Sequence, residues 1–278
     1  MRKFILSALA AVLTFPALAQ ELPRNDTAPP SGASADVRWS GVVRLFTGIS
    51  SCSGALISET LVLTAAHCLF SESGRRLDDG GITVQIGLRN GRPEELRGVS
   101  RSYLPASYSY RARPRFEDVG ADVALLALDR PVRVGAIRPI PTGRGEGPRG
   151  EVTIVSYGDR GRAGPTVQEG CAILEGRLAS RVLSCATVPG DSGAPVMRIT
   201  SLGPEVVGVV AASAQDDRGN DLSLVSALGG QFRGLLAQAR TDARAEANIA
   251  FTPGEGARFV RRAEDGGRSR IGARFVRP

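Results

Sequence analysis

The sequence of 278 residues contains only one histidine, His67, and only one lysine, Lys3. A zinc site needs several cysteine or histidine ligands at short spacing. Because the chain has no second histidine, no CxxC pair and no cofactor motif, we expect it to hold neither a metal nor a cofactor. The net charge of +7 comes from arginines that are spread along the chain and not clustered among aromatic residues. Nucleic-acid binding is therefore not indicated.

Long apolar runs are also scarce, and the one present lies at the N-terminus. A basic head, Met1-Arg2-Lys3, precedes the apolar run FILSALAAVLTFPALA, which ends in a small-x-small cleavage pattern. These features predict a signal peptide over residues 1–19, cleaved after Ala19; an uncleaved anchor is the weaker alternative. The run is too short to span a bilayer comfortably. We therefore expect export to the periplasm or the extracellular medium, with no transmembrane segment in the mature chain.

Cysteine is limited to four residues, and four cysteines in an exported chain predict disulfides. Three pairings are open to Cys52, Cys68, Cys171 and Cys185. We favour the two local pairs, Cys52 with Cys68 and Cys171 with Cys185. Each pair would close a loop of roughly 15 residues, which stabilises the fold by about 3 kcal/mol.

The rest of the chain is organised as short β-prone runs. Residues 20–38 are rich in Pro, Ser and Ala without periodicity and predict a loose N-terminal arm. From Trp39 onwards, runs such as GVVRLF, VALLAL and EVTIVSY alternate with Gly, Pro, Asp and Ser. This pattern indicates an all-β fold. Residues 131–150 are dense in Pro and Gly, so we expect them to connect two β units.

The C-terminal region differs from the rest. Phe232, Leu235 and Leu236 recur at helical spacing, which predicts one helix from about residue 226 to about residue 247. Residues 241–278 form a basic tail in which GARFVR occurs twice, at 256–261 and 272–277. A flexible tail or a small hairpin is the simpler interpretation. The alternative is attachment to anionic surfaces of the cell envelope through the arginines.

Three short motifs carry residues of catalytic type. In GDSG, Ser192 lies between glycines that allow a tight turn with exposed backbone N–H groups. A serine hydroxyl needs a base to become a nucleophile, and His67 is the only histidine available. Asp122 precedes the apolar run VALLAL, where an ionised carboxylate is costly unless it is paired. Glu117 and Asp118 are competitors for this role in a more polar segment.

These motifs resemble the signatures of a known family. LTAAHC, ADVALLAL and GDSGAP occur in the order found in bacterial, exported members of the chymotrypsin/trypsin-like serine peptidases, and SCSGALIS and VVGVVAAS also match. The resemblance implies two six-stranded antiparallel β-barrels with the site between them. We expect the first barrel at 39–132, the second barrel with the helix at 133–240, and the basic tail after it.

The resemblance also implies roles. His67 would be the general base, Asp122 its orienting partner and Ser192 the nucleophile, with the N–H groups of Gly190 and Ser192 forming the oxyanion hole. Cys52 would bridge Cys68. The substrates would be proteins or peptides. A latent peptidase that needs processing, and a non-catalytic binding module on the same fold, are the alternatives.

Two departures from the family pattern affect these expectations. In the family, cleavage creates a new N-terminus of the Ile/Val-Val-Gly-Gly type, whose amine pairs with the aspartate before the serine, here Asp191. No such segment lies near residues 20–30. This pairing is therefore not expected, and the activation route is open. The specificity residue of trypsin-like enzymes is an aspartate, but Ala186 stands there. We expect a small or apolar pocket formed by Ala186, Ala211 and Ser213. Asp221 is an alternative acidic wall, and a glutamate-specific pocket is less favoured because a second histidine is absent.

Overall fold

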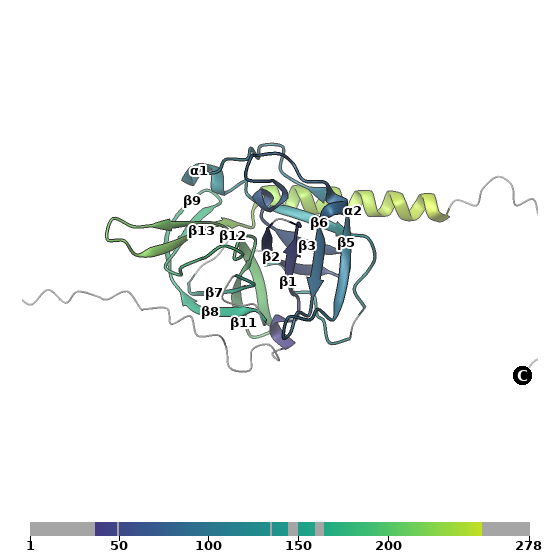
Figure 1. Cartoon of the computed structure of the whole chain (residues 1–278), viewed down its shortest axis with the longest axis horizontal. Helices are drawn as coiled ribbons and strands as arrows, with labels where there is room; N and C mark the ends of the chain where they lie inside the picture. Colours follow the sequence, from purple (N-terminus) through teal and green to yellow (C-terminus); the bar gives the residue numbers. More distant parts are fainter. Residues whose placement is uncertain (1–36, 49, 134, 144–149, 159–163, 252–278) are drawn as a thin grey trace, which may run out of the picture. The chain divides into compact units, whose positions relative to one another are not determined.

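The computed structural model describes a part of the chain from residue 37 to residue 251, with four short gaps: 37–48, 50–133, 135–143, 150–158 and 164–251. The predicted signal peptide, nearly all of the predicted arm and both GARFVR repeats lie outside the described residues. The chain divides into a unit that ends at Ala239 and another that begins at Arg240. Two β units lie side by side in the first of these (Figure 1). In the described part, no helix combines the length and apolarity needed to cross a bilayer.

The first β unit is a closed antiparallel barrel of six strands, in the order β1-β2-β3-β6-β5-β4. β4 pairs with β1 and closes the barrel, with Leu45 opposite Val84. The interior side chains are mostly Val, Leu and Ile, as the period of two along a strand requires. This half confirms the expected barrel. Its strands are β1 (Val42–Phe46), β2 (Ser51–Ser58), β3 (Leu61–Thr64), β4 (Thr83–Ile86), β5 (Glu95–Tyr103) and β6 (Ala124–Leu128).

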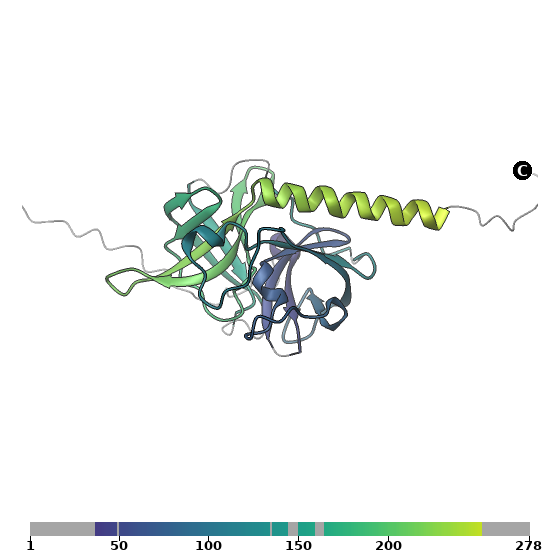
Figure 2. The same ribbon diagram turned by 90° about the horizontal axis from the view of Figure 1, so that it is seen from above.

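The second β unit is a seven-stranded antiparallel sheet, in the order β8-β7-β11-β12-β13-β10-β9. In Figures 1 and 2 the hairpin of the two longest neighbours, β12 and β13, extends away from the rest of the sheet. The strands are β7 (Val152–Ser156), β8 (Thr166–Cys171), β9 (Ile173–Arg177), β10 (Ser180–Leu183), β11 (Pro195–Thr200), β12 (Gly203–Gln215) and β13 (Asp221–Ala227).

The second unit has one strand more than the six expected, because one bent run of chain forms two strands. The two edge strands, β8 and β9, are consecutive in the chain and are separated only by Ala172. β8 pairs with β7 and β9 pairs with β10, so one bent run of chain borders both edges and the sheet curves back on itself. A disulfide between Cys171 and Cys185 lies at the bend. The β-prone pattern of CAILEGRL could not reveal this bend, because both halves are extended.

The expected C-terminal helix is present but shifted by about four residues at both ends, and a short helix that was not expected precedes β6. α2 (Gly230–Phe251) begins later than expected, because Ser226 and its neighbours pair in β13, opposite Ser180 in β10. The buried side chains Phe232 and Leu235 on the first turns of α2 join the hydrophobic core shared by the two β units. A second helix, α1 (Phe116–Val119), is a single turn before β6.

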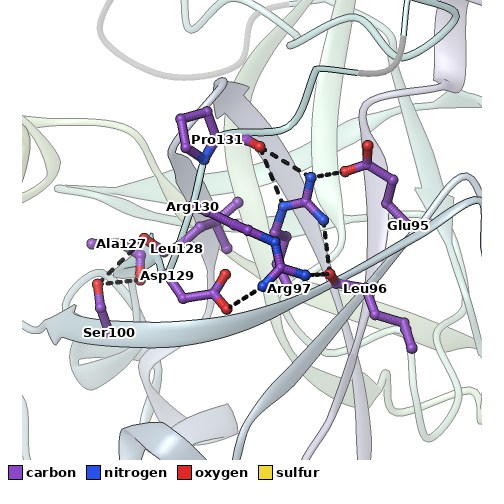
Figure 3. A network of polar contacts seen from close by, with 9 residues as sticks. All are labelled: Glu95, Leu96, Arg97, Ser100, Ala127, Leu128, Asp129, Arg130 and Pro131. Atoms are coloured by element: carbon purple, nitrogen blue, oxygen red, sulfur yellow. Dashed lines mark hydrogen bonds and ion pairs between the residues drawn. The ribbon is translucent and has the colours of Figure 1, made fainter.

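A buried arginine ties β5 to the segment that follows β6 (Figure 3). Only 9% of the Arg97 side chain is exposed. Its Nη1 donates to the carbonyl of Leu96 at 2.8 Å, its Nη2 donates to the carbonyl of Pro131 at 3.0 Å, and Nη2 also forms an ion pair with Glu95. Arg130, beside it, donates to Leu96 and Asp129, but 62% of its side chain is exposed. Burial distinguishes the two arginines.

We expect Arg97→Met to lower the free energy of unfolding by about 3 to 5 kcal/mol, because it leaves Glu95 and two carbonyl groups without their buried partner. The matched control is Arg130→Met, which should change the free energy of unfolding by less than about 1 kcal/mol, since an exposed ion pair contributes little. Urea denaturation followed by circular dichroism measures both changes. Equal effects of the two substitutions would contradict this account.

Candidate active site

His67 and Asp122 lie just beyond the same end of two neighbouring strands of the first barrel. β3 and β6 are antiparallel neighbours, with Thr64 at the end of β3 opposite Ala124 at the start of β6. His67 follows the last residue of β3 by three positions, and Asp122 precedes the first residue of β6 by two. The pairing of β3 with β6 therefore brings the two residues together. The sequence signal for each residue is local, but their proximity is a consequence of this strand pairing.

The backbone at His67 is held by a disulfide and by burial. His67 lies on the 3₁₀ turn η3 (Ala66–Leu69), whose other side chains are buried, and the Cys52–Cys68 disulfide ties this turn to β2. The side chain of His67 is 24% exposed, so the imidazole is not a core side chain. The sulfur atoms of Cys52 and Cys68 lie near the ring, but they are joined to each other and cannot act as thiolate ligands for a metal.

Asp122 binds His67 through both carboxylate oxygens. Oδ1 accepts a hydrogen bond from the backbone N–H of His67 at 2.9 Å, and Oδ2 lies 2.7 Å from the ring nitrogen Nδ1. Asp122 is 5% exposed. Nδ1 therefore carries the proton as donor to the carboxylate, which leaves Nε2 as the nitrogen able to accept a proton. Of the two competitors, Asp118 pairs with Arg111 and Glu117 with Arg115.

The Asp122 carboxylate also sets the protonation of the imidazole. Burial lowers the pKa of His67, but the charge of Asp122 and its hydrogen bond to the ring raise it by more, so the pKa lies above the ordinary value of 6.5. The protonated imidazolium is thus stabilised at this position. This is the electrostatic arrangement that a general base requires, because the base must accept and hold a proton during the reaction.

The loop around Ser192 reaches the first barrel from the second sheet. The carbonyl of Ser192 accepts a hydrogen bond from the backbone N–H of Ser53 on β2 at 2.7 Å. Gly193, with φ +77°, packs so closely that a Cβ there would collide with the hydroxyl of Thr64 and the carbonyl of Ser53. Since Thr64 lies three residues before His67, the structure brings the segment of the predicted nucleophile to the segment of the predicted base.

The same loop presents two backbone donors. Gly190 has φ +93°, a conformation that glycine adopts without strain. The N–H of Asp191 donates to Val188 and that of Gly193 donates to Val210, both through backbone carbonyls. Within the described part of the chain, the N–H groups of Gly190 and Ser192 donate to no acceptor. They are the pair that the family resemblance implies for the oxyanion hole, and this role stays a prediction.

Asp191, which belongs to this loop, has a buried side chain and is only 3% exposed. Its Oδ2 accepts a hydrogen bond from the backbone N–H of Val188 at 2.8 Å. Gly158 packs against its other oxygen, because any Cβ at that position would collide with the carboxylate. The Val188 N–H is thus one partner that supports Asp191 in this structure.

The predicted pocket residues are distributed over three segments. Ala186 follows β10, while Ala211, which is buried, and Ser213, which is exposed, lie on β12. Asp221 pairs with Gln215, two positions beyond Ser213 toward the hairpin tip, and accepts a hydrogen bond from the Gln215 side chain at 2.9 Å. The role of these four residues in specificity stays a prediction.

Sequence reasoning missed two small polar residues, Ser53 and Thr64. Both are completely buried, and the Thr64 hydroxyl donates to the carbonyl of Ser53 at 2.8 Å. Ser53 lies in SCSGALIS and Thr64 in LTAAHC, but these motifs assigned no role to either side chain, and each lies within an apolar β-prone run. The available signal was weak: a hydroxyl inside a buried strand needs a hydrogen-bond partner, and the partner here comes from tertiary structure.

Comparison with known proteins now adds to this geometry. The profile of the family described as Trypsin matches residues 29–227. The chain belongs to the trypsin family. Among its curated relatives in this family, a trypsin-like protease of Streptomyces glaucescens is 31% identical over 183 residues, covering 58% of this chain and 64% of that protein. Human kallikrein-10 is 37% identical over 122 residues, covering 41% and 42% respectively.

The chain spans less than two thirds of the length of these relatives, and only 20% of a bovine suppressor of tumorigenicity 14 protein homolog, to which it is 29% identical. Among solved structures, a Glu endopeptidase in complex with MPD superposes with a TM-score of 0.57, covering 74% of this chain and 94% of that one. Its sequence identity is 18%, so this likeness shows the fold alone. It agrees with the expected family double-barrel architecture.

Because the chain has one histidine, its imidazole can be titrated by NMR without assignment. We expect the pKa of His67 to lie above 6.5 in the native protein. Asp122→Asn removes the charge that raises the pKa and leaves the burial that lowers it, so the pKa should fall below the native value. An unchanged pKa in folded Asp122→Asn protein would contradict the pairing of these two side chains.

Proposed function

We propose that this chain is an exported serine endopeptidase that hydrolyses peptide bonds through His67, Asp122 and Ser192. The observation that carries the proposal is the two-point hydrogen bonding of Asp122 to His67 in a trypsin-family fold. The packing of Gly193 against Thr64 supports it further, because it joins the loop of Ser192 to the segment of His67.

In the first half of the proposed reaction, the hydroxyl oxygen of Ser192 attacks the carbonyl carbon of the substrate. Nε2 of His67 takes the hydroxyl proton, and Asp122 stabilises the resulting imidazolium. The carbonyl oxygen becomes an oxyanion and accepts hydrogen bonds from the N–H groups of Gly190 and Ser192. Removing one such donor typically raises the barrier by about 3 kcal/mol. His67 then protonates the leaving amine, which leaves an acyl ester on Ser192.

In the second half, His67 is neutral again and takes a proton from water. The water oxygen attacks the ester carbonyl, and the same two N–H groups stabilise the second oxyanion. Collapse of this intermediate returns the proton from His67 to Ser192 and releases the carboxylic acid product. No metal or cofactor takes part in this scheme.

The proposed substrates are proteins or peptides, and the side chain preferred before the scissile bond is small or apolar. Ala186, Ala211 and Ser213 support this preference by their small size. Asp221 is the alternative determinant for a basic residue, but it already accepts a hydrogen bond from Gln215 in this structure. Export is supported by the N-terminal signal pattern and by the two disulfides, which persist in oxidising compartments.

A latent form of the same peptidase is the second candidate. It is favoured by one observation, the absence of an Ile/Val-Val-Gly-Gly segment at residues 20–30. A non-catalytic binding module is less favoured, because such a module has no need for the paired Asp122 and His67. Limited proteolysis of the N-terminal arm separates the candidates: only a latent peptidase would gain activity.

The mature chain from Gln20, with its disulfides formed, should react with a fluorophosphonate probe at Ser192. Mass spectrometry of the labelled peptide locates the adduct. The matched variants Ser192→Ala and His67→Ala should lose the reaction, by about 10⁴-fold or more in rate. Absence of an adduct both before and after limited proteolysis would exclude a serine peptidase in this chain.

The rate of peptide hydrolysis should rise with pH through the pKa of His67. The base acts in its neutral form, and its pKa is raised by Asp122, so the midpoint of kcat/KM should lie above 6.5 and agree with the pKa of His67 measured by NMR. Initial rates of hydrolysis of a protein substrate, measured at pH values on both sides of this midpoint, test the agreement. A rate independent of pH below this midpoint would rule out His67 as the base.

A further inference from the structure

We infer that Ser53 is a positioning residue that fixes the orientation of residues 190–192, the loop that carries the nucleophile and the oxyanion donors. The inference rests on the proposed function and deepens it. Ser53 lies on β2 of the first barrel, directly after the disulfide-bonded Cys52, and it is completely buried. It does not contact the reacting atoms and acts through the loop.

Every polar group of Ser53 is used, and two of its bonds go to the catalytic loop. Its N–H donates to the carbonyl of Ser192 at 2.7 Å, and its hydroxyl donates to the carbonyl of Gly190 at 2.8 Å. The same hydroxyl accepts a hydrogen bond from the backbone N–H of Tyr157 at 2.8 Å. Its carbonyl accepts from the hydroxyl of Thr64, also at 2.8 Å.

The two carbonyls that Ser53 binds flank the peptide group that carries the Ser192 N–H, one of the two oxyanion donors. A peptide group is planar, so holding the carbonyls of Gly190 and Ser192 fixes the peptide groups on both sides of this donor. Glycine with φ +93° has many accessible conformations, and its peptide groups can rotate at little cost unless something holds them. The Ser53 hydroxyl holds the peptide group that follows Gly190, through the Gly190 carbonyl.

Ser53 also links the loop to the base. Thr64, which donates to the Ser53 carbonyl, lies at the end of β3, and His67 follows on the next turn. The oxyanion donors belong to the second sheet, whereas His67 and Asp122 belong to the first barrel. A single buried residue therefore sets the position of the donors relative to the base, which is the geometry that transition-state stabilisation depends on.

The test is Ser53→Ala in the mature chain. We expect kcat to fall by about 10- to 100-fold, because removing a whole oxyanion donor lowers kcat by about 100- to 1000-fold and here the donors are only less well held. KM should stay within about 2-fold of the native value. The pH midpoint should not move, because Asp122 and His67 are untouched. Ser53→Thr, which keeps the hydroxyl, should recover most of kcat.

Ser40→Ala is the matched control. The Ser40 hydroxyl also donates to one backbone carbonyl, that of Val37 at 2.8 Å, and accepts from one backbone N–H, that of Arg138 at 3.1 Å. It is buried at 8% exposure but lies outside the catalytic loop. We expect it to lower Tm without lowering kcat. An equal loss of kcat in Ser40→Ala would overturn the inference, and so would a native kcat in Ser53→Ala.

Amide hydrogen exchange gives a second test that does not depend on activity. Residues 190–193 should exchange faster in Ser53→Ala than in the native chain, and Ser40→Ala should leave their exchange unchanged. Unchanged exchange in Ser53→Ala overturns the inference whatever the activity. If the native chain neither reacts with a fluorophosphonate nor cleaves peptides, the proposed function fails, and the exchange result still decides the role of Ser53.

Discussion

The paired hydrogen bonds between Asp122 and His67 are the interaction on which the rest of the site depends. One bond holds the backbone of the turn and the other holds the ring, so the carboxylate fixes both the position and the tautomer of the imidazole. The pairing of Thr64 with Ala124 supplies this proximity without any special loop. Burial of the carboxylate makes the pairing necessary, since an isolated buried charge would be costly.

Close packing between the two β units imposes the second constraint. Gly193 lies against Thr64 and Ser53 of the first barrel with no room for a side chain, and within the second unit Gly158 lies equally close to Asp191. Glycine is thus required at both places by contact, and at Gly193 also by a backbone φ of +77°. The first barrel supplies the imidazole and the carboxylate, the second sheet supplies the loop of Ser192, and buried hydroxyls join them.

Sequence patterns predicted the all-β class and favoured the two local disulfide pairs, because these depend on local periodicity and on short chain separation, whereas the barrel architecture was implied by the family resemblance. The bend at Ala172 and the late start of α2 were not predictable in this way, because both follow from which strands pair: β9 with β10, and Ser226 with Ser180. Motifs identified His67, Asp122 and Ser192 as candidates. Ser53 lies within SCSGALIS, but that motif assigned no role to its side chain, because its hydroxyl binds residues more than a hundred positions away in the chain.

The most direct test of this account is a crystal structure of the mature chain after reaction with a peptide boronic acid. The account predicts a tetrahedral boron bonded to the hydroxyl oxygen of Ser192, with one boronate oxygen accepting hydrogen bonds from Gly190 and Ser192 N–H and with Ser53 still bonded to the carbonyl of Gly190. An unmodified Ser192, with the carbonyl of Gly190 turned away from Ser53, would contradict it.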